Sequence, residues 1–151
     1  MAINVREVKS LDHFGCWTDR YIVLNDQIML LSLFGTATRV NALKAVILKG
    51  EVEIYLSPLI FSNLFYILRK MTTRPKAGET LKKLRSLIHI LPIDDKIIDQ
   101  ALHSEFPDLE DAIQYFTALD NNIPILITRN KRDYKLSAIS VNTAAEFLDS
   151  R

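Results

Sequence analysis

The feature of this sequence that most constrains its fold is an alternation of short apolar runs with longer helical stretches. Three runs rich in β-branched or aromatic residues have the pattern of buried parallel strands: Tyr21 to Leu24, Glu53 to Leu56 and Ile125 to Thr128. Two shorter candidates are Ile90 to Ile93 and Ile139 to Val141. Helical patterns lie between these runs, so the alternation predicts an α/β fold with a central parallel sheet that helices cover on both faces.

Capping residues mark several helix starts. Ser57 followed by Pro58 predicts an N-cap with proline at the first helical position. Asp94 and Thr143 mark the starts of two later helices. The segment from Thr72 to Gly78 is predicted to be the loosest internal connection.

Composition sets broad limits. A chain of 151 residues is long enough for one domain with a real core. Its 19 basic and 18 acidic side chains give a net charge of +1, so any affinity for nucleic acid must come from a local patch. The single cysteine, Cys16, rules out an internal disulfide and fits a reducing compartment. No apolar run approaches the ~20 residues of a membrane helix and no signal-peptide pattern is present, so we expect a soluble cytoplasmic protein without a membrane partner.

Residues 1–19 do not join the alternation. We expect them to form an N-terminal extension, with an added strand around Ile3 and Val5, that docks on the domain or on a neighbouring subunit. The domain itself is expected to span residues 20–151.

Polar side chains lie on both sides of the strand that begins at Ile125. Asp108 and Asp111 open the helix before it, and Asn130 and Asp133 follow it. If the first and fourth strands are neighbours, residues 25–27 at the end of the first strand would face this loop. Oxygen ligands gathered there could hold Mg²⁺ or Mn²⁺ and orient a water against a phosphodiester.

The same residues also have a purely structural interpretation. Asp108 is a good N-cap, and the helix dipole favours acids in the first turn. Asn130 and Asp133 could be turn residues whose side chains bond to nearby backbone. The spacing alone leaves both interpretations open.

Four segments together resemble the PIN domain, the metal-dependent ribonuclease-like fold of VapC-type toxins in bacterial toxin-antitoxin pairs. In chain order they are SPLIFSNLFYILRK, DLEDAIQY, ITRNKRDY and AISVNTAAEFL, and the resemblance spans about residues 20 to 149. It implies a three-layer α/β/α sandwich with a central parallel sheet. It also implies endonucleolytic cleavage of RNA with Mg²⁺ or Mn²⁺, an antitoxin partner and a homodimer.

The resemblance assigns roles to individual residues. Asp111 matches the central metal-binding acid, Asp108 an acid beside it, and Asp133 the acid after the fourth strand, so these three are the expected catalytic residues. The expected metal ligands are Asp111, Asp133 and Asn25. The residues of the same loop expected to contact RNA are Thr128, Arg129 and Asn130.

Two positions depart from the family pattern. Asn25 stands where the first metal-binding aspartate is expected, and Asn63 where a glutamate is usual. An amide oxygen can ligate Mg²⁺ but brings no charge. Asp26 is no simple substitute, because a one-residue slip at a strand end turns the side chain to the other face. One hypothesis is therefore a VapC-like endoribonuclease with weakened or lost activity, and the alternative is a catalytically inactive PIN-like module that binds RNA or protein.

The segment after residue 57 carries two further patterns. The helix from Leu59 to Leu68 is apolar around nearly its whole circumference, which predicts burial in the core or partly against another chain. Basic residues cluster after it, and both RNA contact and an ordinary solvated surface remain open for them. They are Arg69, Lys70, Arg74, Lys76, Lys82, Lys83 and Arg85.

Overall fold

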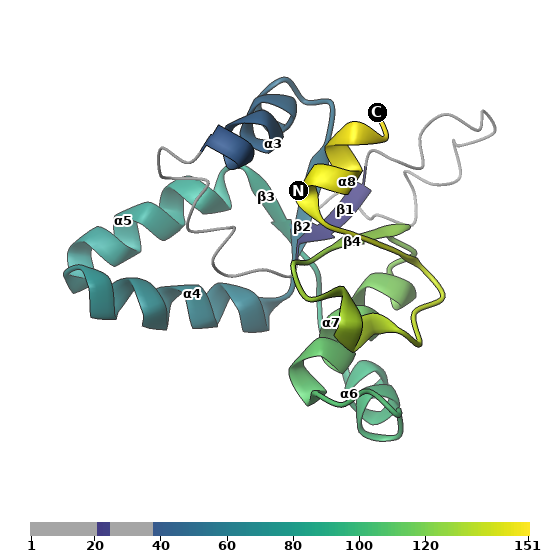
Figure 1. Cartoon of the computed structure of the whole chain (residues 1–151). Coiled ribbons are helices and arrows are strands. Elements are labelled where there is room, and N and C mark those ends of the chain that lie inside the picture. Colours follow the sequence, from purple (N-terminus) through teal and green to yellow (C-terminus); the bar gives the residue numbers. More distant parts are fainter. Residues whose placement is uncertain (1–20, 25–37) are drawn as a thin grey trace.

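The computed structural model describes residues 21–24 and 38–151 of the chain. Its centre is a five-stranded sheet in the order β3-β2-β1-β4-β5, and all four strand pairs are parallel (Figure 1). The strands are β1 (Tyr21–Leu24), β2 (Glu53–Leu56), β3 (Ile88–Ile90), β4 (Ile125–Ile127) and β5 (Ser140–Asn142). The helices are α3 (Thr38–Leu48), α4 (Pro58–Met71), α5 (Arg74–Arg85), α6 (Asp95–Leu102), α7 (Leu109–Asp120), the 3-10 turn η2 (Lys131–Tyr134) and α8 (Ala144–Asp149).

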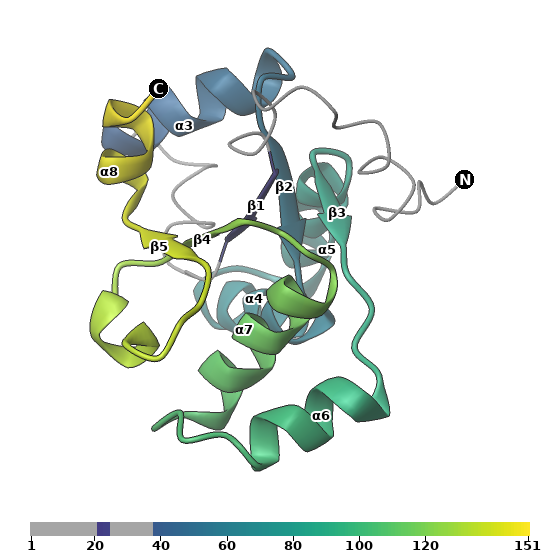
Figure 2. The ribbon, with the colours of Figure 1, turned by 90° about the vertical axis from the view of Figure 1, so that its right-hand side faces the viewer.

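Alternate residues of the strands face two separate helical layers. On one face Ile54 of β2 and Ile125 of β4 pack into a core cluster with residues of α3, α4, α5 and α8. On the other face Tyr55 contacts Ala118 of α7, and Leu126 packs with residues of α7 and η2. In Figure 2, α6 and α7 lie together below the sheet and α3 and α8 together above it. The predicted three-layer α/β/α sandwich is therefore correct.

The predicted caps form as hydrogen bonds. The buried Ser57 hydroxyl accepts from the Ile60 N–H at 3.3 Å, and the Asp94 carboxylate accepts from the Ile97 N–H at 3.0 Å. Thr143 and Glu146 form a reciprocal capping box at the start of α8. These caps fix where α4, α6 and α8 leave the sheet.

Three predictions about individual segments need correction. The third strand is Ile88–Ile90 and not Ile90 to Ile93, because Pro92 has no N–H to continue the ladder. The segment 72–78 is not loose: Thr73 caps α5, and proline lies in the first turn, where its missing N–H does no harm. Helix α4 is not buried all round, since Tyr66 is 62% exposed. The predicted N-terminal extension lies outside the described residues.

Candidate active site

The strand order has a switch point beside β1. β2 and β3 lie on one side of β1 and β4 and β5 on the other, so the order reverses between β1 and β4. Leu24 pairs with Ile127 in this register, and the predicted adjacency of the first and fourth strands is therefore correct. Asn25 and Asp26, which follow Leu24 in the sequence, lie outside the described residues.

Asp111 sits at the amino end of α7, where the helix start positions it. The Asp108 carboxylate caps the helix by accepting from the Asp111 N–H at 3.0 Å. Asp111 itself is partly buried, and its Oδ1 accepts a hydrogen bond from the Tyr134 hydroxyl at 2.9 Å. Tyr134 is 3% exposed and packs edge-on against Phe106, with ring centroids 5.9 Å apart. The tyrosine therefore links the acid on α7 to the loop after β4.

The loop after β4 is folded by its own side chains. Thr128 is 3% exposed, and its hydroxyl accepts from the Asn130 N–H at 3.1 Å. The Thr128 N–H donates to the Asn142 carbonyl at 3.0 Å, which carries the pairing with β5 one residue beyond the strand. The Asn130 amide donates to the Asp133 carboxylate. The Thr128 side chain thus bonds to the backbone of this loop. The side chains of Asn130 and Asp133, the turn residues of the structural interpretation, bond to each other and not to nearby backbone in this contact.

A second contact joins α4 to the start of α7. The Asn63 amide donates to the Glu110 carboxylate at 3.1 Å. The resemblance predicts a glutamate at position 63, and the contact brings Asn63 to the residue that precedes Asp111. At the acidic start of α7, Tyr134 therefore donates to Asp111, and Asn63 donates to the neighbouring Glu110.

The three basic residues at the start of the loop, Arg129, Lys131 and Arg132, are all exposed. Lys131 is paired with both carboxylate oxygens of Glu146 at 2.9 and 3.0 Å. The Thr143 backbone N–H, and then the Lys131 ammonium, hold the pKa of Glu146 below its ordinary value. Lys131 is thus tied to the capping box of α8.

The donor chemistry of this region suits a hard divalent cation, because Asp111 and Asp133 offer carboxylate oxygens. Within residues 38–151 and the β1 segment, however, no three acids, histidines or cysteines form a group that could hold a metal. Asp108 caps the helix, and Asp133 accepts from Asn130. The described side chains alone therefore fall short of a metal site of three charged ligands.

One polar side chain in α7 is buried without a partner. Gln114 is fully buried, and both atoms of its side-chain amide lack a hydrogen bond within the described structure. It follows Asp111 by three residues, so the two lie on neighbouring positions of the same helical face. Buried polar groups normally have a partner, which sets this position apart from the rest of the core.

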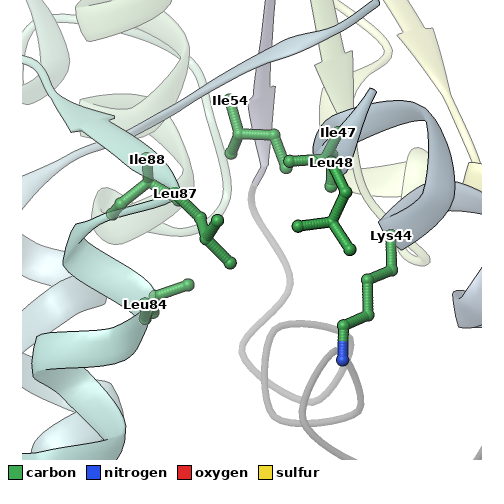
Figure 3. Close-up of a pocket in the computed structure, with 7 residues that line it drawn as sticks. All are labelled: Lys44, Ile47, Leu48, Ile54, Leu84, Leu87 and Ile88. Atoms are coloured by element: carbon green, nitrogen blue, oxygen red, sulfur yellow. The ribbon is translucent and has the colours of Figure 1, made fainter. Parts of the chain in front are cut away.

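The described part of the chain also has an apolar hollow on the opposite side of the sheet from the acids. It lies where α3 and α5 lead into the amino ends of β2 and β3 (Figure 3). Its lining residues are Lys44, Ile47, Leu48, Ile54, Leu84, Leu87 and Ile88. The hollow contains no acid and is separate from the candidate active site.

Two residues of the site escape prediction from the sequence. Tyr134 follows the predicted acid Asp133, but its position beside Asp111 depends on how η2 folds back onto α7. Glu110 looks like one of several acids favoured by a helix start, and its contact with Asn63 spans 47 residues. The only sequence signal for either is its place next to a predicted site residue.

A parallel α/β sandwich with acids at its switch point defines a class of small α/β proteins with a candidate hydrolytic site. The sequence model of the PIN domain matches residues 22–132, and the chain belongs to the PIN domain family. Ribonuclease VapC1 of Aquifex aeolicus is 24% identical over 109 residues, which cover 69% of this chain and 74% of that protein. None of the described helices is long and apolar enough to cross a membrane.

Two solved structures share the fold. VapBC2 from Rickettsia felis, bound to a DNA fragment from their promoter, superposes with a TM-score of 0.63 at 16% identity, covering 81% of this chain and 98% of that chain. A protein from Pyrobaculum aerophilum superposes with a TM-score of 0.58 at 16% identity, covering 93% and 96%. Both likenesses concern the fold alone.

Proposed function

We propose that this protein is a VapC-like endoribonuclease of the PIN family, dependent on a divalent cation and weaker than family members with a complete acidic set. The observation that carries the proposal is Asp111, held at the switch point by the Tyr134 hydroxyl at 2.9 Å. A fixed carboxylate in this place suits a hard cation beside RNA. The similarity to ribonuclease VapC1 supports RNA as the substrate class.

The catalytic roles expected from the sequence are kept for Asp111 and Asp133, and Asp108 is given a positioning role. The proposed metal ligands are the carboxylates of Asp111 and Asp133 and the amide oxygen of Asn25. Asp108 acts on Asp111 by capping its helix. A bound Mg²⁺ or Mn²⁺ would supply Lewis-acid activation of water or phosphate.

The expected weakness of the enzyme follows from charge. Asn25 and Asn63 are neutral where the family pattern has acids, and Asn63 donates its amide to Glu110. A Mg²⁺ site depends on one or two carboxylates for its affinity, so each missing charge weakens binding. Thr128 and Asn130 shape the loop, while Arg129 and Arg132 are the proposed contacts to the RNA phosphates.

The decisive experiment measures RNA cleavage with Mn²⁺ or Mg²⁺ in the wild-type protein and in Asp111→Asn. We expect slow cleavage that Asp111→Asn abolishes and that Asn25→Asp increases. Asp95→Asn is the matched control. Like Asp111, Asp95 is an acid in the first turn of a helix, but it is exposed and lies on α6. Cleavage that survives Asp111→Asn, or that Asp95→Asn removes equally, would refute the assignment.

The second candidate function is a catalytically inactive module that binds RNA or protein. It is favoured by the Asn63 contact, which satisfies an acid of α7 with an amide at 3.1 Å. RNA binding in EDTA, without cleavage in Mn²⁺ even for Asn25→Asp, would select this alternative.

The proposed setting is a cytoplasmic toxin-antitoxin pair in which this chain forms a homodimer and binds an antitoxin protein. The support is the similarity to ribonuclease VapC1 and to the fold of VapBC2. Light scattering of the purified protein tests the dimer. Co-expression with the product of a neighbouring small gene, followed by co-purification, tests the antitoxin partner.

A further inference from the structure

The hairpin of α4 and α5 carries a strong local excess of positive charge. Its segment from residue 69 to 85 has seven basic residues and one acid, a net charge of +6, whereas the whole chain has +1. The two helices contact each other and project from the sheet as an arm (Figure 1). The ion pairs found among the described residues involve Lys96, Lys131 and Arg151, and none involves a basic residue of this segment.

Helix stability explains only part of this charge. Basic residues in the last turn of a helix are stabilised by the dipole. This accounts for Arg69 and Lys70 in α4 and for Lys82, Lys83 and Arg85 in α5. Arg74 and Lys76 lie instead in the first turn of α5, where the dipole disfavours cations and no acid accompanies them. The tip of the hairpin therefore collects four exposed cations, and two of them oppose the stability of the helix that carries them.

A stripe of α4 connects the candidate active site to this tip. Asn63, Tyr66 and Lys70 are spaced three and four residues apart, so they lie along one face of the helix. Asn63 contacts Glu110 beside Asp111, and Lys70 is about 10 Å further along the helix axis. Tyr66 lies between them, 62% exposed, with the Lys70 ammonium 4.3 Å from its ring centroid.

We propose that Tyr66, Arg69, Lys70, Arg74 and Lys76, here called the hairpin track, bind the single-stranded part of an RNA whose phosphodiester lies at the acidic site. The inference rests on the proposed function and adds to it where the rest of the RNA runs. The cations hold phosphates, and the exposed tyrosine ring offers a face on which a base can stack. An acidic protein segment would use the cations but not the ring, so the combination favours single-stranded RNA.

The test is fluorescence anisotropy of a labelled single-stranded RNA of mixed sequence, titrated with the full-length protein in EDTA at several salt concentrations. Arg74→Gln with Lys76→Gln is expected to weaken binding about tenfold and to reduce the slope of log K against log salt by about 1.4, for two lost phosphate contacts. Lys82→Gln with Lys83→Gln is the matched control. It removes the same charge from the last turn of the same helix and is expected to change affinity by about twofold.

Tyr66→Ala tests the stacking contact separately. We expect it to lower affinity for single-stranded RNA about tenfold while leaving binding to a duplex of the same sequence unchanged. Because Tyr66 is exposed, its loss should leave the circular dichroism spectrum and the melting temperature close to those of the wild type. Equal losses for single strand and duplex would overturn a stacking role.

Three results would overturn the hairpin track: no RNA binding by the wild type in EDTA, equal losses in both double variants, or competition by polyglutamate as strong as by RNA. The last result would assign the surface to an acidic protein segment. Failure here is distinct from failure of the proposed nuclease. Cleavage that depends on Asp111 but is indifferent to the hairpin variants keeps the nuclease and removes the track. RNA binding that depends on the hairpin track, without any cleavage, keeps the track and removes the nuclease.

Discussion

Replacing Tyr134 by phenylalanine removes one hydroxyl and leaves the ring packed against Phe106. The lost hydrogen bond runs from a 3% exposed donor to the Asp111 carboxylate at 2.9 Å. Hydrogen bonds to charged groups contribute about 1.5 to 3 kcal/mol, and Asp111 is only partly buried. We therefore expect the free energy of unfolding to fall by about 1.5 kcal/mol. Urea denaturation should show a lower midpoint with an unchanged m value.

A double-mutant cycle with Asp111→Ala identifies the partner. If the hydroxyl acts through Asp111, the two substitutions are non-additive by about 1 kcal/mol. Tyr55→Phe is the matched control, because this 5% exposed tyrosine donates to the Glu53 carboxylate at 3.0 Å elsewhere in the sheet. Its cycle with Asp111→Ala should be additive within about 0.5 kcal/mol. Additivity for Tyr134, or equal coupling for Tyr55, would refute the link between η2 and α7.

Three further outcomes are expected. Ser57→Ala removes the buried cap of α4 and should cost about 1 to 2 kcal/mol in urea denaturation, while an unchanged midpoint would show that the cap is dispensable. Gln114→Met replaces a buried amide that lacks a partner in the described structure, so the melting temperature should hold or rise, and a fall would reveal a partner. Because the pKa of Glu146 is lowered, its contribution to stability is complete at neutral pH and is lost as the pH falls below the ordinary value of 4.5. Lys131→Met should reduce the fall in the free energy of unfolding at acidic pH. The same pH dependence as in the wild type would argue against the ion pair of Lys131 with Glu146.

The sheet was predictable because hydrophobicity and capping agree along most of the chain. The first two strands match their predicted bounds, and Ser57, Asp94 and Thr143 cap the predicted helices. The third strand shifted because the apolar run continues through Leu91 and Ile93, beyond the point where Pro92 ends the pairing. Residues 72–78 were misjudged because proline and glycine favour loops in general, while a proline in a first helical turn does not.

The candidate site was predictable in location but not in detail. Strand order and acid spacing place Asp111 and the loop after β4 at the switch point. The hydrogen bond from Tyr134 spans 23 residues and that from Asn63 spans 47, and no local pattern encodes such contacts. The roles of Asp108, Asp111, Asp133 and Asn25 remain predictions that the cleavage experiment tests.

The contact between Asn63 and Glu110 has a consequence for how this protein can change over generations. Glutamate at position 63 would place a second carboxylate where the amide now donates at 3.1 Å. Two carboxylates at that distance repel unless a proton or a cation lies between them. The effect of a substitution at position 63 therefore depends on the residue at position 110. If Asn25 contributes to a metal site as proposed, an acid at position 63 becomes more favourable after an acid has appeared at position 25. The order of the two substitutions would then matter.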